Sequence, residues 1–168
     1  MNWKALLEAE VENTYAVTDR LLALVGDGDL DWKPSAGSNW MTTGQLLMHL
    51  GMACGAPMRG FVSGDWGMPE DAEMGDQPPA AKLPAAASVA EARRLVSEDK
   101  RASLQALAAS SEDDLAHKKA PAPWDPTEIV LGHRLLQMVD HLKQHKGQLF
   151  YYLKLQGKPV STPDLWGA

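Results

Sequence analysis

Two histidines, His141 and His145, lie four residues apart in the segment VDHLKQHKGQLFYYLKLQG, residues 139–157. On an α-helix, side chains at positions i and i+4 have Cβ atoms about 6 Å apart. Two imidazoles at that separation can therefore bind one metal ion at about 2.1 Å from each nitrogen. Two solvated polar residues would show the same spacing. The side of the helix on which the rings lie, and a third ligand opposite them, decide between these interpretations.

The helical period places these histidines beside the core-facing stripe of their helix. That apolar stripe comprises Leu131, Leu135, Met138, Leu142, Leu149 and Leu153. At 100° per residue, His141 and His145 flank it and lie away from the polar side. His49 lies about 90° from the centre of a second apolar stripe, which comprises Leu46, Leu47, Leu50 and Ala53. If the two helices are neighbours, the three imidazoles converge.

A site of three imidazoles leaves coordination positions open to water or substrate, as catalytic metal sites do. Neutral imidazole suits Zn, Ni, Cu or Fe, so the ligand set does not select one metal. The remaining histidines are predicted to be solvated, because His117 adjoins two lysines and His133 falls on the polar side of its helix.

No catalytic carboxylate or nucleophile can be assigned from the sequence. Asp19 and Asp140 are acidic, but no pattern places either one near the histidines. Arg134, Gln148 and Tyr152 follow the same helix edge as the histidine pair. They could bind substrate, although such positions more often hold ordinary amphipathic side chains.

Four helices are predicted to position these residues, and no convincing strand is found. The first runs from about Asn2 to Val25, and the second from Thr42 to about Ala56, with Thr42 and Gln45 as a capping box. The third runs from Ser88 to about Ala109. The fourth is expected to have Asp125 as its cap, Pro126 in its first turn and its end at Gly157. Close packing against a neighbour would explain Gly132 and Gly147 inside this last helix.

A long segment from Pro57 to Ala87, rich in Gly, Pro, Ala and acidic residues, separates the second helix from the third. Connections of this length are unusual inside compact domains. A four-helix bundle in which the second and third helices run parallel requires one, because the chain must return along the whole bundle. We therefore expect a crossover inside a single domain that spans residues 1–168.

The composition excludes several classes of function. A net charge of −6 with scattered basic residues argues against nucleic-acid binding. No apolar run approaches the roughly 20 residues that span a bilayer, and no export signal precedes the first helix. We therefore expect a cytoplasmic protein. The one cysteine, Cys54, sits among apolar residues and is predicted to be a buried, inert thiol.

The order of these motifs resembles the DinB-like (YfiT-like) four-helix-bundle family. The resemblance rests on SNWMTTGQLLMHL, which ends one residue after His49, and on HLKQHKGQ, in which Lys146 replaces the arginine of the family's Arg-Gly-Gln. It implies an up-down-down-up bundle and one divalent metal ion per chain on His49, His141 and His145. Nickel or zinc is the implied metal, with iron or manganese as alternatives.

The resemblance also implies chemistry and assembly. Relatives include transferases and isomerases that use low-molecular-weight thiols, and some are called hydrolases. We therefore expect a metal-dependent enzyme that acts on a small molecule, with thiol-dependent transfer or isomerisation as the leading reaction and hydrolysis as the alternative. A non-catalytic protein that binds a metal or ligand under stress is the rival interpretation. Many members are homodimers, and Trp3, Trp66, Trp124 and Trp166 could lie at such an interface.

Overall fold

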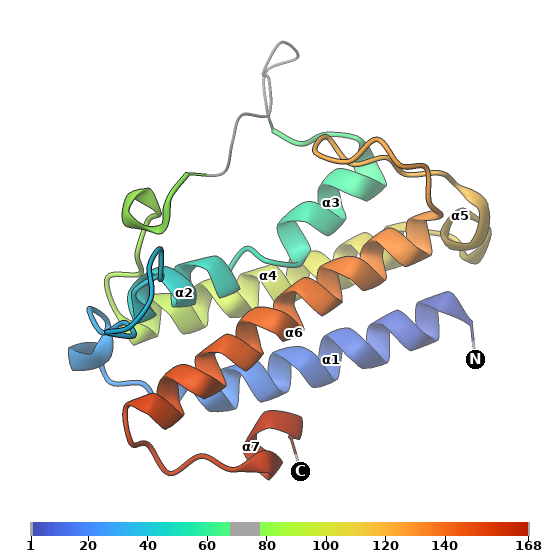
Figure 1. Ribbon diagram of the computed structural model, residues 1–168. Helices are drawn as coiled ribbons and strands as arrows, with labels where there is room; N and C mark the ends of the chain where they lie inside the picture. Colours follow the sequence, from blue (N-terminus) through green and yellow to red (C-terminus); the bar gives the residue numbers. More distant parts are fainter. Residues whose placement is uncertain (1, 68–77, 168) are drawn as a thin grey trace.

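The computed structural model describes residues 2–67 and 78–167, which form an all-helical bundle (Figure 1). The long segments of the bundle are α1 (Trp3–Leu22), α2 (Thr43–Leu50) with α3 (Gly55–Ser63), α4 (Val89–Ala109) and α6 (Leu131–Leu155). The short segments are α5 (Glu112–His117), α7 (Thr162–Trp166) and the 3-10 turns Asp27–Asp29 and Ala80–Lys82. The described residues contain two isolated β-bridges and no strand, so the predicted all-α class is confirmed.

Contacts between α1 and α4 show that these helices are antiparallel. Asp19, near the end of α1, pairs with Arg93 near the start of α4 at 2.7 Å. At the other end, Glu112 follows α4 and accepts a hydrogen bond from the backbone N–H of Trp3 at 2.7 Å. This carboxylate joins Asn2 in satisfying the free N–H groups of the first turn of α1.

The α2–α3 segment runs in the same direction as α4. Gly51 packs against Leu95, and four residues further along both segments Gly55 packs against Asp99. Helix α6 runs the opposite way, because Gly132 near its start contacts Trp3 at the start of α1. Figure 1 shows the same directions in the colour order of the helices.

Side-chain caps begin α1, α2 and α4. Asn2 caps α1, Ser88 accepts from the backbone N–H of Glu91, and Thr42 forms a capping box with Gln45. The amide of Gln45 also donates to the carbonyl oxygens of Ala80 and Leu83, at 2.7 and 2.8 Å. The starts predicted for the first three helices are therefore confirmed.

The predicted second helix is broken, which corrects its expected extent of residues 42–56. Helix α2 ends at Leu50, and α3 begins at Gly55. Pro57 therefore lies in the first turn of α3, where its missing N–H leaves no hydrogen bond unmade. The segment between Ser63 and Val89 contains a 3-10 turn, and residues 68–77 of the predicted crossover lie outside the described residues.

The predicted start of the last helix at Asp125 is wrong. Helix α6 begins at Leu131, six residues later. Asp125 instead accepts hydrogen bonds from the backbone N–H of Thr127 at 3.0 Å and from the guanidinium of Arg134 at 2.9 Å. These hydrogen bonds lower the pKa of Asp125 to about 2. The carboxylate therefore stabilises a loop that its helix-cap pattern did not indicate.

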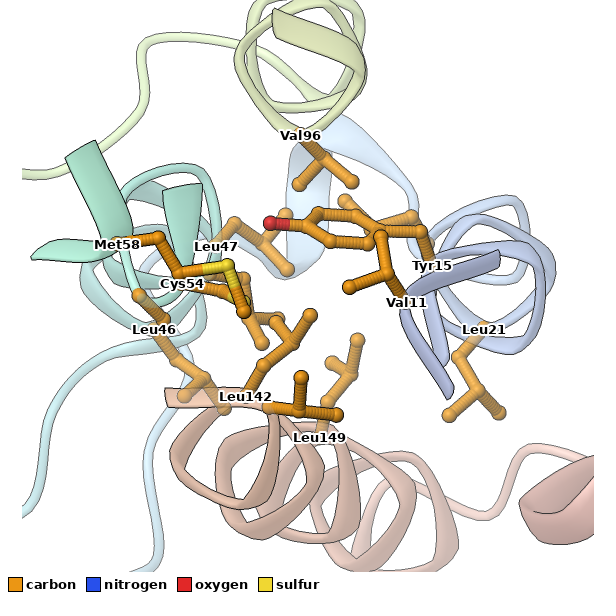
Figure 2. Close-up of a cluster of buried hydrophobic side chains, with 14 of the residues drawn as sticks. Val11, Tyr15, Leu21, Leu46, Leu47, Cys54, Met58, Val96, Leu142 and Leu149 are labelled. Atoms are coloured by element: carbon orange, nitrogen blue, oxygen red, sulfur yellow. The ribbon is translucent and has the colours of Figure 1, made fainter. Parts of the chain in front are cut away.

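The core lies between α1, α2–α3, α4 and α6. Figure 2 shows the ring of Tyr15 extending from α1 toward Cys54, with Val96 of α4 on one side and Leu142 of α6 on the other. All of the leucines predicted to form the apolar stripe of α6 are buried. Every helix among the described residues is too short or too polar to span a lipid bilayer.

The two glycines inside α6 differ. A Cβ atom on Gly132 would lie 2.7 Å from the Trp3 ring and 2.8 Å from the carbonyl oxygen of Leu115, so close packing requires glycine there. A Cβ atom on Gly147 would have no atom within 4 Å. The expectation of close packing is confirmed for Gly132 and wrong for Gly147.

Candidate metal centre

The three histidines singled out by their spacing lie together. His141 Nε2 is 3.2 Å from His49 Nε2 and 3.0 Å from His145 Nε2. One ligand nitrogen from each ring lies within 4.8 Å of the others, and all three side chains are half-buried. Two ligands that each lie about 2.1 Å from one ion, at angles between a right angle and a tetrahedral angle, are about 3.0–3.4 Å apart. The separations of His141 Nε2 from the other two Nε2 atoms, 3.2 and 3.0 Å, fall within that range.

A chain of hydrogen bonds fixes the protonation of His145. The backbone carbonyl of Met41 can only accept, so the Tyr152 hydroxyl donates its proton to it, at 2.9 Å. The Tyr152 oxygen then accepts from the amide Nε2 of Gln148 at 3.1 Å. The amide Oε1 of Gln148 consequently faces His145 Nδ1, at 3.1 Å, and this nitrogen carries the proton. His145 Nε2 is left with its lone pair directed at the other rings.

A backbone carbonyl fixes the protonation of His141 in the same way. His141 Nδ1 donates to the carbonyl oxygen of Ala53 at 2.9 Å. In an unbroken helix that oxygen would accept from the N–H of residue 57, but residue 57 is a proline and has none. The break between α2 and α3 together with Pro57 therefore frees the carbonyl that orients His141.

These constraints leave two lone pairs facing each other. His141 Nε2 and His145 Nε2 both lack a proton and are 3.0 Å apart, which is repulsive unless a cation or proton lies between them. Metal-bound histidines commonly donate their second N–H to a carbonyl or an amide oxygen, which fixes the ring and raises its basicity. The residues present therefore fit a divalent cation.

Burial favours the neutral, ligand form of the rings. It lowers the pKa of His49 from its usual 6.5 to about 4, with further lowering by His145 and His141. Burial is also the main reason for a lowered pKa of His145, partly offset by its hydrogen bond to Gln148. At neutral pH the rings of His49 and His145 are therefore neutral, which is the form that binds a metal ion.

Asp99 of α4 maintains the helix break that positions Ala53. Its buried carboxylate accepts from the backbone N–H groups of Cys54 at 3.1 Å and Ala56 at 2.9 Å, and from the Tyr15 hydroxyl at 2.7 Å. It thus caps the N-terminus of α3 from a neighbouring helix, where a negative charge is favoured. Gly55 permits the approach, since a Cβ there would lie 2.1 Å from the Asp99 carbonyl oxygen.

Several other predictions are settled by contacts. His117 and His133 are exposed, and His117 ends α5 and pairs with Asp113 at 2.9 Å. Arg134 is buried and holds the loop before α6 through the carbonyl oxygens of Ala120 and Thr127, so it is not free to bind substrate.

Two further residues lie away from the histidines. The Lys146 ammonium donates to the carbonyl oxygen of Leu165 in α7 at 2.7 Å. Cys54 is buried, and burial raises the pKa of its thiol to about 12, so the predicted inert thiol is confirmed.

Comparison with known proteins assigns the chain to a family. The family model of the DinB superfamily matches residues 10–149. The chain belongs to the DinB superfamily, as its resemblance indicated. No curated protein matches it.

Solved structures share the fold. A DinB-like protein from Bacillus cereus ATCC 10987 is 16% identical, with a TM-score of 0.66 over 89% of this chain and 90% of the other. A DinB-like protein from Bacillus subtilis is 17% identical, with a TM-score of 0.65 over 92% and 94%. A protein from Exiguobacterium sibiricum 255-15 is 18% identical, with a TM-score of 0.65 over 98% of both chains.

The lowered histidine pKa values predict how the metal-free protein responds to pH. The folded pKa of His49 is about 4 and its unfolded value about 6.5, so between these values the unfolded chain binds more protons. The free energy of unfolding should therefore be highest above about pH 6.5 and fall as the pH decreases toward 4. Urea denaturation of chelator-treated protein at several pH values measures this. The His49→Gln variant should lose less stability over the same interval, and an unchanged pH dependence in this variant would contradict the assignment.

Proposed function

We propose that this protein is a divalent-metal-dependent enzyme that acts on a small molecule, with His49, His141 and His145 as metal ligands. The observation that supports this most strongly is that the Nε2 atoms of His141 and His145 lie 3.0 Å apart, while the Nδ1 atom of each ring faces a hydrogen-bond acceptor. Three ligands from the protein leave coordination positions open for substrate or water. Structural metal sites, by contrast, have all their positions filled by protein ligands.

The residues around the triad hold it in a fixed geometry. Gln148 and Tyr152 fix the ring of His145, and the Ala53 carbonyl fixes that of His141. A bound divalent ion supplies Lewis acidity, which favours the deprotonated form of a thiol or of water at neutral pH. The half-buried surroundings limit competition from solvent for the open positions.

The reaction that we propose first is thiol-dependent transfer or isomerisation, with nickel or zinc as the metal. The family resemblance supports it, since its relatives include transferases and isomerases that use low-molecular-weight thiols. Metal-dependent hydrolysis is the alternative, because the same ligand set serves both reactions. The only thiol of the chain, Cys54, does not compete for the role, because it is buried and burial raises its pKa.

Turnover by reconstituted protein tests the proposal. Untagged protein is stripped with a chelator, reloaded with Zn²⁺ or Ni²⁺, and assayed with thiols plus electrophiles and separately with ester and amide substrates. We expect turnover that requires the metal and is absent from His145→Ala protein. A product that retains the thiol indicates transfer, and cleavage without a thiol indicates hydrolysis. Stoichiometric metal without turnover in any assay would favour the non-catalytic alternative.

We also propose that the protein is a homodimer, as the family resemblance implies. Trp3 and Trp66 have contacts within the chain, with Gly132 and with Phe61 respectively, whereas Trp124 and Trp166 are 49% and 70% exposed. Light scattering at micromolar concentration that gives the 18.3 kDa mass of one chain would contradict this.

A further inference from the structure

A groove of about 890 Å³ lies beside the histidine triad. One wall is the loop from Trp32 to Trp40, which precedes α2, and the other is the second half of α6 from Lys143 to Leu155. Its volume is within the range of about 300–1,000 Å³ that is usual for small-molecule sites. Its lining is mainly apolar, with a few polar groups at its edges.

The aromatic wall of the groove is held in place. The Tyr152 ring meets Trp32 edge to face at 5.2 Å between centroids and Trp40 at 6.3 Å. The indole N–H of Trp40 donates to the carbonyl oxygen of Ala36 at 2.7 Å, so its polar atom is satisfied within the loop while 40% of the residue stays exposed. Gly37 makes this possible, since it has a φ of +88° and a Cβ there would lie 2.8 Å from the indole nitrogen.

Hydrogen bonds connect the groove to the triad. Gln148 and Tyr152 both line the groove, and Gln148 accepts a hydrogen bond from His145. One amide thus separates the aromatic wall from a proposed metal ligand. Gln148 therefore belongs both to the lining of the groove and to the hydrogen-bond chain that orients His145.

The charges of the groove select an anionic ligand. Its lining contains Lys33 and Lys143 and no acidic residue, in a chain whose net charge is −6. Lys143 is paired with Glu10 at 2.6 Å, whereas Lys33 is exposed. The positive charge that meets a ligand therefore comes mainly from Lys33, at the rim of the aromatic wall.

We propose that this groove binds a flat apolar or aromatic small molecule that carries an anionic group, and that it holds the substrate of the triad. The ring system lies against the exposed face of Trp40, and the anion lies near Lys33. This inference rests on the proposed function for the role of the ligand as substrate, but not for its binding.

Two matched fluorescent probes test the chemistry of the groove. 8-Anilinonaphthalene-1-sulfonate carries an anionic group, and N-phenyl-1-naphthylamine is the same ring system without it. Each is titrated into metal-free and metal-loaded protein. We expect saturable binding of one sulfonate per chain, about three-fold tighter or more than the neutral probe at low salt, with this preference lost in Lys33→Ala.

Variants locate the binding. Trp40→Ala should weaken the binding of both probes by about 10-fold, because it removes the exposed face of the aromatic wall. Trp166→Ala, which removes a 70% exposed indole on α7 outside the groove, is the matched control and should bind as the parent does. Near-ultraviolet circular dichroism confirms that each variant retains its packed core, which excludes probe binding to a loosened fold.

The outcomes separate this inference from the proposed function. Equal binding by parent and Trp40→Ala protein, or no preference for the sulfonate, would overturn the proposal that the groove binds an anionic aromatic molecule. If Trp40→Ala instead converts a dimer into a monomer in light scattering and the parent excludes both probes, the groove is an interface between two copies. Probe binding requires no metal, so saturable binding in a protein without metal-dependent turnover would overturn only the proposed function.

Discussion

Replacing His49, His141 or His145 by alanine is expected to weaken metal binding by more than about 100-fold, above the range for loss of an outer-shell partner. Each variant removes one of three nitrogens that lie within 4.8 Å of one another. The helices should persist, because the leucine stripe of α6 is buried independently of the imidazoles. Competition between the protein and a chromophoric chelator for Zn²⁺ measures the affinity, and circular dichroism measures the helical content.

The two remaining histidines provide matched controls for this experiment. His117 and His133 are both exposed, so their alanine variants should bind metal as the parent does. Parent-like affinity in the His141→Ala and His145→Ala proteins would remove these residues from the site. A parent protein that takes up neither Zn²⁺ nor Ni²⁺ would do the same for the whole triad.

Replacing Asp99 by alanine is expected to lower the free energy of unfolding by about 3–5 kcal/mol. The change leaves the N–H groups of Cys54 and Ala56 without their acceptor, and the Tyr15 hydroxyl keeps only Ser103 Oγ as a partner. Breaking a buried charged network costs about this much, since each abandoned donor keeps its desolvation penalty. Cys54 and Ala56 flank the start of α3 and follow Ala53 directly. Without Asp99, the Ala53 carbonyl that orients His141 should lose its fixed position, and metal affinity should fall as well.

Denaturation with guanidinium chloride measures the stability of this variant. Asp19→Ala is the matched control, because its ion pair with Arg93 is about half exposed and should contribute no more than about 1 kcal/mol. Asp99→Asn retains one acceptor oxygen, so its free energy of unfolding should lie between those of Asp99→Ala and Asp19→Ala. Stability of Asp99→Ala within about 0.5 kcal/mol of the parent would show that this network does not maintain the break between α2 and α3.

The candidate ligands could be predicted because the information that reveals them is local. The i,i+4 spacing of His141 and His145, and their place beside a leucine stripe, follow from the helical period alone. His49 shows the same relation to its own stripe. Predicting a shared site from these three positions required one assumption, that the two helices are neighbours. The structure confirms this, because His49 contacts His141.

The helix boundaries that failed depend on residues outside the local pattern that predicted them. The break after Leu50 requires the carboxylate of Asp99, which arrives from another helix. The pattern Asp125-Pro126 has the composition of a helix start, but Arg134 binds Asp125 and the carbonyl of Thr127 outside the helix. Neither interaction has a signature within the local sequence.

The groove was not predicted for a similar reason. Trp32 and Trp40 lie in a loop without periodicity, so their position against Tyr152 follows only from the packed structure. The available signal was weak: Gly37 three residues before an exposed tryptophan in a short polar loop. Gln148 and Tyr152 were noted on the correct helix edge, but their joint role in fixing His145 required the position of Met41.

The hydrogen-bond chain that ends at Met41 also determines where protons cannot travel. The Tyr152 hydroxyl donates its one hydrogen bond to a main-chain carbonyl, and this carbonyl has no proton to pass on. The same is true of His141, whose Nδ1 proton rests on the carbonyl of Ala53. The hydrogen bonds from the Nδ1 atoms of His145 and His141 thus end in carbonyl oxygens. Neither ring can relay a proton through the protein interior. A proton that a reaction at the triad releases therefore cannot leave through the outer nitrogen of His141 or of His145.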